Sequence, residues 1–169
     1  MSKFTIETQK ELNWCWAAVA TTVGLYYEST KQLQQCQVAQ TVTGIANCCS
    51  GEAACDQFGA LDVALTAVNS ILPATLNNQI RPGKVLKFAA VQAEIDAGRP
   101  VGVRIQWYGE DPNAGHFVII SGYAIEASGE KWVDVSDPYY EDSTVPYDQF
   151  VSAYLEAGSW SDTYLIGQP

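Results

Sequence analysis

The chain has 169 residues, of which 47% are hydrophobic, and a formal net charge of −10. This length suffices for a single compact domain, over residues 1–169, with a buried core. No stretch approaches the roughly 18 uncharged apolar residues of a membrane-spanning helix, so we expect a soluble protein. The negative charge disfavours nucleic acid and anionic membranes as partners.

The excess of acidic residues lies in the C-terminal part of the chain. Residues 1–104 hold eight acidic and eight basic side chains, whereas residues 105–169 hold eleven acidic side chains and one basic one, Lys131. A negative field of this kind attracts cationic partners. It therefore favours substrates or proteins that carry basic residues.

Helices are predicted for the first 75 residues. Val19, Val23 and Tyr27 recur at helical spacing behind Asn13, a good N-cap residue, which predicts a helix over 14–27 with Cys15 in its first turn. Two further helices are expected. They span 31–42 and 60–71, and a cysteine-rich loop at 47–56 separates them.

The pattern changes after residue 76, where amide side chains, Pro82 and Gly83 mark a crossover. The segments that follow are rich in Val, Ile and aromatic residues between turn residues, as is typical of strands. We expect strands at 100–107, 117–125, 131–135 and 162–167, a short helix at 89–97 and another at 147–155. The prediction is an α+β fold with a helical lobe over about 1–78 and a β lobe over about 79–169.

Five cysteines form an odd set, at positions 15, 36, 48, 49 and 55. Cys15 stands apart, and neighbouring cysteines such as Cys48 and Cys49 are badly placed to bond each other. The remaining options are 36 with 48 and 49 with 55, or 36 with 49 and 48 with 55. Four thiolates holding a structural zinc ion are the alternative, although no Cys-x-x-Cys pair is present. Disulfides would indicate an oxidising compartment, so that the protein would be secreted or periplasmic.

A possible catalytic pair follows from the single histidine, His116, and the cysteine that the bonding pattern leaves over, Cys15. A thiol at a helix N-terminus feels the positive end of the backbone dipole, and a neighbouring imidazolium favours the thiolate further. Taken singly, however, a lone cysteine is more often a small buried hydrophobe, and a lone histidine is more often a hydrogen-bonded core residue.

The block in which Gln9 precedes Cys15 by six residues and Trp16 follows it resembles the papain-like cysteine peptidases. The run from Asn13 to Ala18 and the block Gly115-His116-Phe117 look closest to the small bacterial branches, including bacteriocin-processing and effector-type peptidases. The resemblance implies a papain-like fold in which the cysteine heads the central helix and the histidine stands on the β lobe. It further implies that Gln9 and the Cys15 N–H form the oxyanion hole.

The third catalytic residue in those branches is often an aspartate before a proline, which here is Asp137. Strand alternation puts Asp137 on the face of Val133 and Val135, whereas the alternative, Asp134, shares its face with polar neighbours. A carboxylate on an apolar face needs a partner, and an imidazole N–H would be one. The chain lacks papain's Cys-Gly-Ser-Cys and Asn-Ser-Trp blocks, which leaves the substrate subsites open.

The sequence thus predicts a cysteine endopeptidase with Cys15, His116, Asp137 and Gln9 as catalytic residues and with no cofactor or metal. Trp107 and the loop 109–115 are expected to line the cleft. We expect a monomer that acts on proteins or peptides, with basic residues near the cleaved bond. A thiol acyltransferase or deamidase using the same residues, or a disulfide-stapled binding domain with no activity, are the alternatives.

Overall fold

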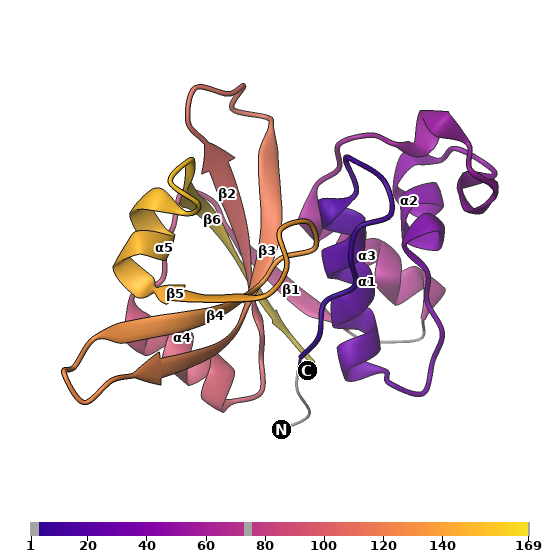
Figure 1. The fold of residues 1–169 in the computed structure, drawn as a ribbon. Coiled ribbons are helices and arrows are strands. Elements are labelled where there is room, and N and C mark those ends of the chain that lie inside the picture. Colours follow the sequence, from indigo (N-terminus) through magenta and orange to yellow (C-terminus); the bar gives the residue numbers. More distant parts are fainter. Residues whose placement is uncertain (1–3, 73–75, 169) are drawn as a thin grey trace.

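The computed structural model describes residues 4–72 and 76–168 (Figure 1). Helices from the first part of the chain pack beside one six-stranded antiparallel sheet, so the predicted α+β fold is confirmed. The elements of the helical part are α1 (Cys15–Tyr27), α2 (Gln35–Thr43) and α3 (Leu61–Ile71), with short 3₁₀ turns η1 (Cys48–Ser50) and η2 (Ala53–Cys55).

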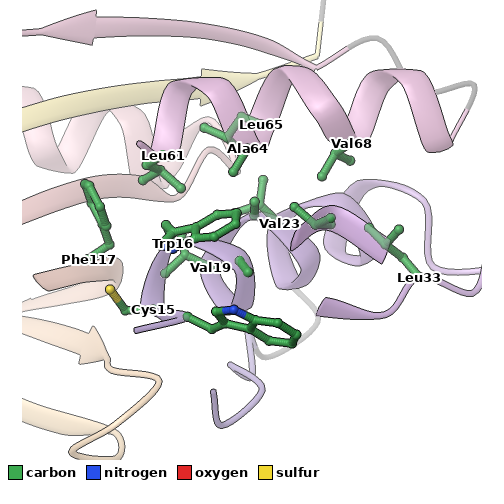
Figure 2. Packing of buried hydrophobic residues seen from close by; sticks show 14 of the residues in the cluster. Cys15, Trp16, Val19, Val23, Leu33, Leu61, Ala64, Leu65, Val68 and Phe117 are labelled. Atoms are coloured by element: carbon green, nitrogen blue, oxygen red, sulfur yellow. The ribbon is translucent and has the colours of Figure 1, made fainter. Parts of the chain in front are cut away.

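Helix α1 is the central helix, because its first ten residues, Cys15–Gly24, are all buried. A helix that is apolar on every side must be surrounded by other elements. Helix α3 packs its apolar stripe of Leu61, Leu65 and Val68 against it (Figure 2). The two helices approach closely at Gly24, where an added Cβ would lie only 2.7 Å from Val68 Cγ1.

The predicted N-cap of α1 is wrong. Trp14 occupies the cap position and makes no side-chain cap bond. Asn13 lies one residue earlier, where its N–H donates to Asp56 Oδ1 (2.8 Å) and its side-chain amide donates to Asp56 O (3.4 Å). The Asn13 side chain is therefore used to hold the neighbouring loop, and the first turn of α1 stays free of a side-chain cap.

Helix α2 begins at Gln35 rather than at residue 31. The reason is a local cap, since the Gln34 N–H donates to the Gln37 side chain at 2.9 Å. Glutamine at both positions gives the start signal that the sequence prediction overlooked.

The strands follow the order β1-β6-β2-β3-β4-β5, and all neighbours are antiparallel. Their bounds are β1 Asn77–Arg81, β2 Val101–Trp107, β3 Gly115–Ile125, β4 Lys131–Ser136, β5 Ser143–Pro146 and β6 Gly158–Gly167. The sequence missed β1 and β5, and it started β6 four residues late, at 162. Both missed strands are short edge strands with few buried side chains, so neither carries the alternating apolar pattern of a half-buried strand.

Each face of the sheet packs against helices. Phe117, Ile119 and Tyr164 belong to the hydrophobic cluster of α1 and α3, whereas Val118 and Ile120 face the opposite cluster. Helices α4 (Phe88–Asp96) and α5 (Tyr147–Ala153) cover that second face. Successive β3 residues thus alternate between two cores, which fixes the register of the strand that carries His116.

The cysteine-rich loop contains two disulfides, Cys36–Cys49 and Cys48–Cys55, while Cys15 is free. Of the two pairings that the sequence left open, this is the second. The zinc alternative is wrong, because all four sulfurs are bonded to each other in pairs. In the described ranges, no other group of three or more metal-binding side chains is present either.

Candidate active site

Cys15 is the first residue of α1 and is buried, with its sulfur directed toward the sheet (Figure 2). The cysteine-rich loop at 47–56, which contacts the start of this helix, is held by the two disulfides. The Trp14 indole N–H donates to Cys55 O at 2.8 Å, and the Trp16 indole N–H donates to Gln57 O at 3.0 Å. The two tryptophans that flank Cys15 therefore anchor the start of the helix to the stapled loop.

His116 is the second residue of β3 and lies against Cys15 across the junction of the helices and the sheet. Its side chain is 7% exposed, and Nε2 lies 2.8 Å from Asp137 Oδ1. A carboxylate accepts, so Nε2 carries the hydrogen. Cys15 and His116 border the same cleft, and the Cys15 side chain is close enough to raise the pKa of the imidazole. This leaves Nδ1 as the ring nitrogen available to the sulfur.

Asp137 is fully buried just beyond β4 and is surrounded by donors. Its Oδ1 also accepts the N–H groups of Tyr139 (2.8 Å) and Tyr140 (2.9 Å), and its Oδ2 accepts the phenol of Tyr154 (2.8 Å). Four donors thus compensate the burial of one carboxylate. The alternative, Asp134, is not near the imidazole but accepts the Thr144 hydroxyl at 2.7 Å.

The electrostatics of this group favour a charged pair. Burial lowers the pKa of His116, but the hydrogen bonds and charges of Asp137 and Cys15 outweigh it and raise the value to about 9. Burial raises the pKa of Asp137, but the hydrogen bond and charge of His116, with the backbone N–H groups, leave it below its usual value. The imidazolium–carboxylate pair therefore persists at neutral pH.

Aromatic rings enclose the histidine. The Trp107 ring stacks on His116 with centroids 5.8 Å apart and an interplanar angle of 19°, and Tyr140 meets the imidazole edge-on at 5.8 Å. Tyr154 stacks against Trp107, with ring centroids 6.4 Å apart. These rings exclude water from the ion pair, which strengthens it.

Gln9 borders a cleft that Cys15 and His116 also line. Its backbone N–H donates to the carbonyl oxygen of Pro138, the residue after Asp137, at 2.9 Å. Its side-chain Nε2 donates to Glu11 O (2.9 Å) and to Leu12 O (2.8 Å). Its buried Oε1 has no hydrogen-bond partner within the described residues. Donation from Gln9 to a substrate oxygen therefore requires one of the two Nε2 bonds to be exchanged.

Two adjoining clefts meet at Cys15, and Phe58 also borders both. The first, which we call the His116 cleft, has a volume of about 620 Å³ and includes Gln9, Trp107 and Tyr140. The second, which we call the Arg104 cleft, has a volume of about 490 Å³ and includes Gly59, Arg104 and Tyr164. The sulfur thus lies in the floor of a groove that extends to either side of it.

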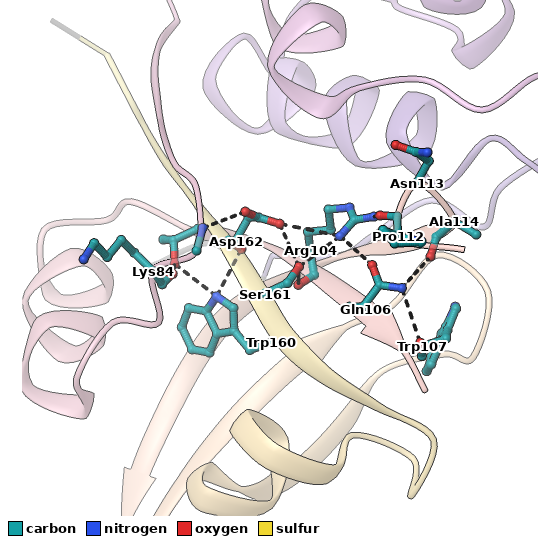
Figure 3. A network of polar contacts seen from close by, with 12 residues as sticks. Lys84, Arg104, Gln106, Trp107, Pro112, Asn113, Ala114, Trp160, Ser161 and Asp162 are labelled. Carbon is teal, nitrogen blue, oxygen red and sulfur yellow. Dashed lines mark hydrogen bonds and ion pairs between the residues drawn. The ribbon is translucent and has the colours of Figure 1, made fainter. Parts of the chain in front are cut away.

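The loop before His116 is held by a polar network around Arg104 (Figure 3). The Arg104 guanidinium donates to Pro112 O (2.6 Å) and Ser161 Oγ (3.1 Å) and pairs with Asp162 (3.6 Å). It crosses directly over Gly115, where an added Cβ would lie 2.6 Å from Arg104 Cζ. Glycine before the histidine is therefore a steric requirement of this network.

Tyr154, Tyr140 and Arg104 contact the site but were missed from the sequence. The sequence held a signal for Tyr140. An aspartate followed by proline often forms a turn in which the aspartate side chain accepts the N–H groups of the residues two and three positions later. Those are the Tyr139 and Tyr140 bonds. No local pattern indicates Tyr154 or Arg104, since their contacts depend on how separate strands and helices meet.

The arrangement has known relatives. The model of the Peptidase_C39 like family matches residues 1–164. The chain belongs to this family. Members are cysteine peptidases with the papain-like fold, which agrees with the resemblance drawn from Gln9, Cys15 and His116. No curated protein matches in a sequence search.

Solved structures show the same fold at low sequence identity. A double glycine motif protease from an AMS/PCAT transporter, in complex with its leader peptide, is 17% identical with a TM-score of 0.55, over 99% of this chain and 94% of that one. The bromelain protease from Ananas comosus, in complex with the E64 inhibitor, is 13% identical with a TM-score of 0.58, over 98% and 94%. At these identities the likeness establishes the fold alone.

Over residues 4–72 and 76–168, none of the helices combines the length and the apolar character needed to cross a bilayer.

Proposed function

We propose that the protein is a cysteine endopeptidase in which Cys15 is the nucleophile, His116 the general acid and base, and Asp137 the residue that orients the imidazole. The observation that carries this proposal is that His116, bonded to Asp137 at 2.8 Å, borders the same open groove as the free thiol of Cys15. Nucleophile, base and orienting group within hydrogen-bond reach are the signature of covalent catalysis.

The chemical steps follow from these positions. The Cys15 thiolate attacks the peptide carbonyl carbon and forms a C–S bond, while the oxyanion accepts bonds from the Cys15 N–H and the Gln9 amide. The C–N bond then breaks as His116 gives its Nδ1 proton to the leaving amine. Water attacks the resulting thioester, His116 takes its proton, and the carboxylic acid and the thiolate are released.

The two disulfides support a secreted or periplasmic location, because such bonds persist in oxidising compartments. A peptide or protein substrate is supported by the groove on either side of Cys15 and by the relative that was solved with a leader peptide. The same residues would serve an acyltransferase or a deamidase, so the reaction product distinguishes these activities.

Labelling of the native protein provides the first test. Four of the five cysteines are in disulfides, so iodoacetamide reports on Cys15 alone. We expect alkylation at pH 6 to be far faster than for a free thiol, and we expect His116→Ala to remove that advantage. Slow labelling of the folded wild-type protein would instead indicate a binding domain with a buried, inactive thiol.

Product masses provide the second test. Incubation with a proteome-derived peptide mixture should yield chain cleavage that Cys15→Ala abolishes, with the loss of His116 lowering turnover by several orders of magnitude. Ammonia release without cleavage would assign a deamidase, and amine incorporation would assign an acyltransferase. Absence of any Cys15-dependent product would contradict the proposal.

A further inference from the structure

The exposed apolar side chains of the molecule gather at one place. Ten large hydrophobic side chains are exposed in the described part of the chain. Six of them line the His116 cleft: Leu12, Phe58, Tyr108, Tyr139, Tyr140 and Leu155. The other four, Val63, Ile80, Val85 and Ile125, lie outside it. Apolar surface that concentrates around a site, rather than scattering singly, marks an interaction surface.

The chemistry assigns this surface to one side of the scissile bond. His116 must give its proton to the leaving amine, so the leaving part of the substrate lies on the His116 side of the sulfur. The His116 cleft contains both His116 and Gln9, whereas the Arg104 cleft shares Cys15 but contains neither. The His116 cleft therefore holds the segment that follows the cleaved bond.

The lining of the cleft indicates which side chains it accepts. Apart from His116, Glu110 is the only charged side chain among the described residues that border it. Trp107, stacked on the imidazole, and Tyr140, edge-on to it, give an aromatic wall. The volume of about 620 Å³ is in the range of sites that enclose a ligand, roughly 300–1,000 Å³.

A strained turn presents one of these apolar residues. Leu155 and Glu156 both have positive φ angles, 50° and 60°. Residues other than glycine rarely adopt this left-handed backbone region. The turn is closed by the Ala157 N–H donating to Tyr154 O at 3.1 Å, and Leu155 remains 45% exposed at the cleft. Strain that places an apolar side chain in solvent beside a site is typical of a ligand contact.

We propose that the His116 cleft selects peptide substrates with large apolar or aromatic residues in the first positions after the cleaved bond. This inference rests on the proposed peptidase function and names its substrate class. The leaving segment packs against Trp107, Tyr140 and Leu155, and its burial raises the rate of acyl-enzyme formation, because the same contacts hold the amine nitrogen near His116.

The test begins with the wild-type protein and a proteome-derived peptide library, with Cys15→Ala as the blank. Cleavage sites should be enriched in Leu, Phe, Tyr and Trp at the first two positions after the cut. Synthetic peptides that differ only there should show kcat/KM on the order of 10-fold higher for Leu or Phe than for Gly or Asp.

A matched pair of variants locates the effect. Leu155→Asn removes the apolar side chain and introduces a residue that tolerates the positive φ of this position. Ile125→Asn makes the same change at a similarly exposed residue, 52% exposed, that lies outside both clefts. We expect Leu155→Asn to lose several-fold of the preference for Leu over Gly. We expect Ile125→Asn to keep both the full preference and the wild-type turnover of the Gly peptide.

The two proposals fail in different ways. Cys15-dependent cleavage that is indifferent to the residues after the cut, or a preference that Leu155→Asn leaves intact, would overturn the substrate inference and leave the peptidase standing. A lack of Cys15-dependent cleavage for every peptide in the library would overturn the peptidase function itself.

Discussion

The charge state of His116 depends on Asp137 and Cys15, and in the proposed mechanism it sets the pH range of the reaction. The pKa of the imidazole stands at about 9 because the bonds and charges of Asp137 and Cys15 outweigh the effect of burial. The imidazolium is therefore the resting form at neutral pH, which is the form that the proposed mechanism needs to protonate a leaving amine. Since the chain has one histidine, a single imidazole resonance reports on this group without assignment.

Replacing Asp137 by Asn should lower the pKa of His116, because Asn removes the negative charge that raises it. The alkaline limb of kcat/KM should lie near pH 9 in the wild-type protein and move to lower pH in Asp137→Asn. NMR titration of the imidazole gives the same shift independently of turnover. An imidazole that titrates at the same pH in both proteins would contradict the role of Asp137.

The linked effect on stability has a definite sign. A folded-state pKa of His116 above the unfolded value of roughly 6.5 stabilises the fold below that value, and this contribution is lost as pH rises through about 9. For Asp137 the lowered pKa has the opposite consequence, since its contribution is present above the unfolded value and is lost in acid. The alkaline loss should be absent in His116→Gln, as measured by urea unfolding between pH 6 and 10.

Tyr154 should orient Asp137 through its phenol. Burial raises the pKa of this phenol, as do the charge and bond of Asp137, so it remains a donor. Tyr154→Phe removes a buried hydrogen bond to a charged group, and we expect kcat to fall on the order of 10-fold with KM little changed. The pKa of His116 should rise, because the carboxylate then has one donor fewer competing with the imidazolium.

Tyr147→Phe is the matched control for that variant. Tyr147 is the first residue of α5, the helix that ends just before Tyr154, and it donates its phenol to Leu86 O, away from the site. It should leave both kcat and the histidine titration unchanged. Equal losses in the two variants, without movement of the imidazole resonance in Tyr154→Phe, would show that Tyr154 only packs.

The candidate site could be predicted from the sequence only where local pattern carries the information. Strand alternation separates Asp137 from Asp134, and the structure brings Asp137 to the imidazole. Tyr154 could not be found, because its contact requires the turn after α5 to place it beneath a loop that follows β4. Asn13 misled the prediction, because it has the chemistry of an N-cap but bonds to Asp56 instead.

At the scale of elements, the start of α1 depends on the disulfide-stapled loop. The Cys48–Cys55 bond fixes the segment whose carbonyl group accepts the Trp14 indole N–H, and Asp56 follows directly. The position of Cys15 is therefore coupled to a loop some forty residues further along the chain. The sequence predicted the loop and limited the pairings to two, but adjacent cysteines offer no local basis for choosing between them.

Removing this disulfide should affect both stability and activity. The double variant Cys48→Ser with Cys55→Ser should lower the free energy of unfolding by roughly 2–3 kcal/mol. It should also reduce kcat/KM, because the helix start loses its support. The control is the double variant Cys36→Ser with Cys49→Ser. It removes the other disulfide, which closes a longer loop (sequence separation 13 rather than 7) and does not include the segment bonded to Trp14. Equal activity per folded molecule in both variants would show that the loop does not position Cys15.

At the scale of the whole molecule, the proposed active site is divided between two packed halves of the chain. Cys15 comes from the helices, while His116 and Asp137 come from the sheet, and the Gln9 N–H bond to Pro138 O links the two near the cleft. The order of helices and strands could be predicted because it depends on local periodicity. The distance between sulfur and imidazole could not, because it depends on the side chains that fill both hydrophobic clusters.

The uneven charge gives a prediction at this largest scale. Residues 105–169 contribute eleven acidic side chains and one basic side chain, Lys131. Among the described residues that line the His116 cleft, however, Glu110 is the only acidic one. Any preference for basic substrates should therefore come from the long-range field rather than from a contact at the cleaved bond. Such a field is screened, since the Debye length falls from about 30 Å at 0.01 M salt to about 3 Å at 1 M.

Two peptides with the same apolar residues after the cut, but with Lys or Glu several positions away, separate these effects. We expect kcat/KM to favour the Lys peptide at low salt, on the order of several-fold, and the two values to converge at 1 M salt because the acidic side chains are then screened. A Lys preference that persists at high salt would indicate a direct ion pair at the cleft instead. Equal rates for the two peptides at low salt would show that the negative field of residues 105–169 does not act on the substrate.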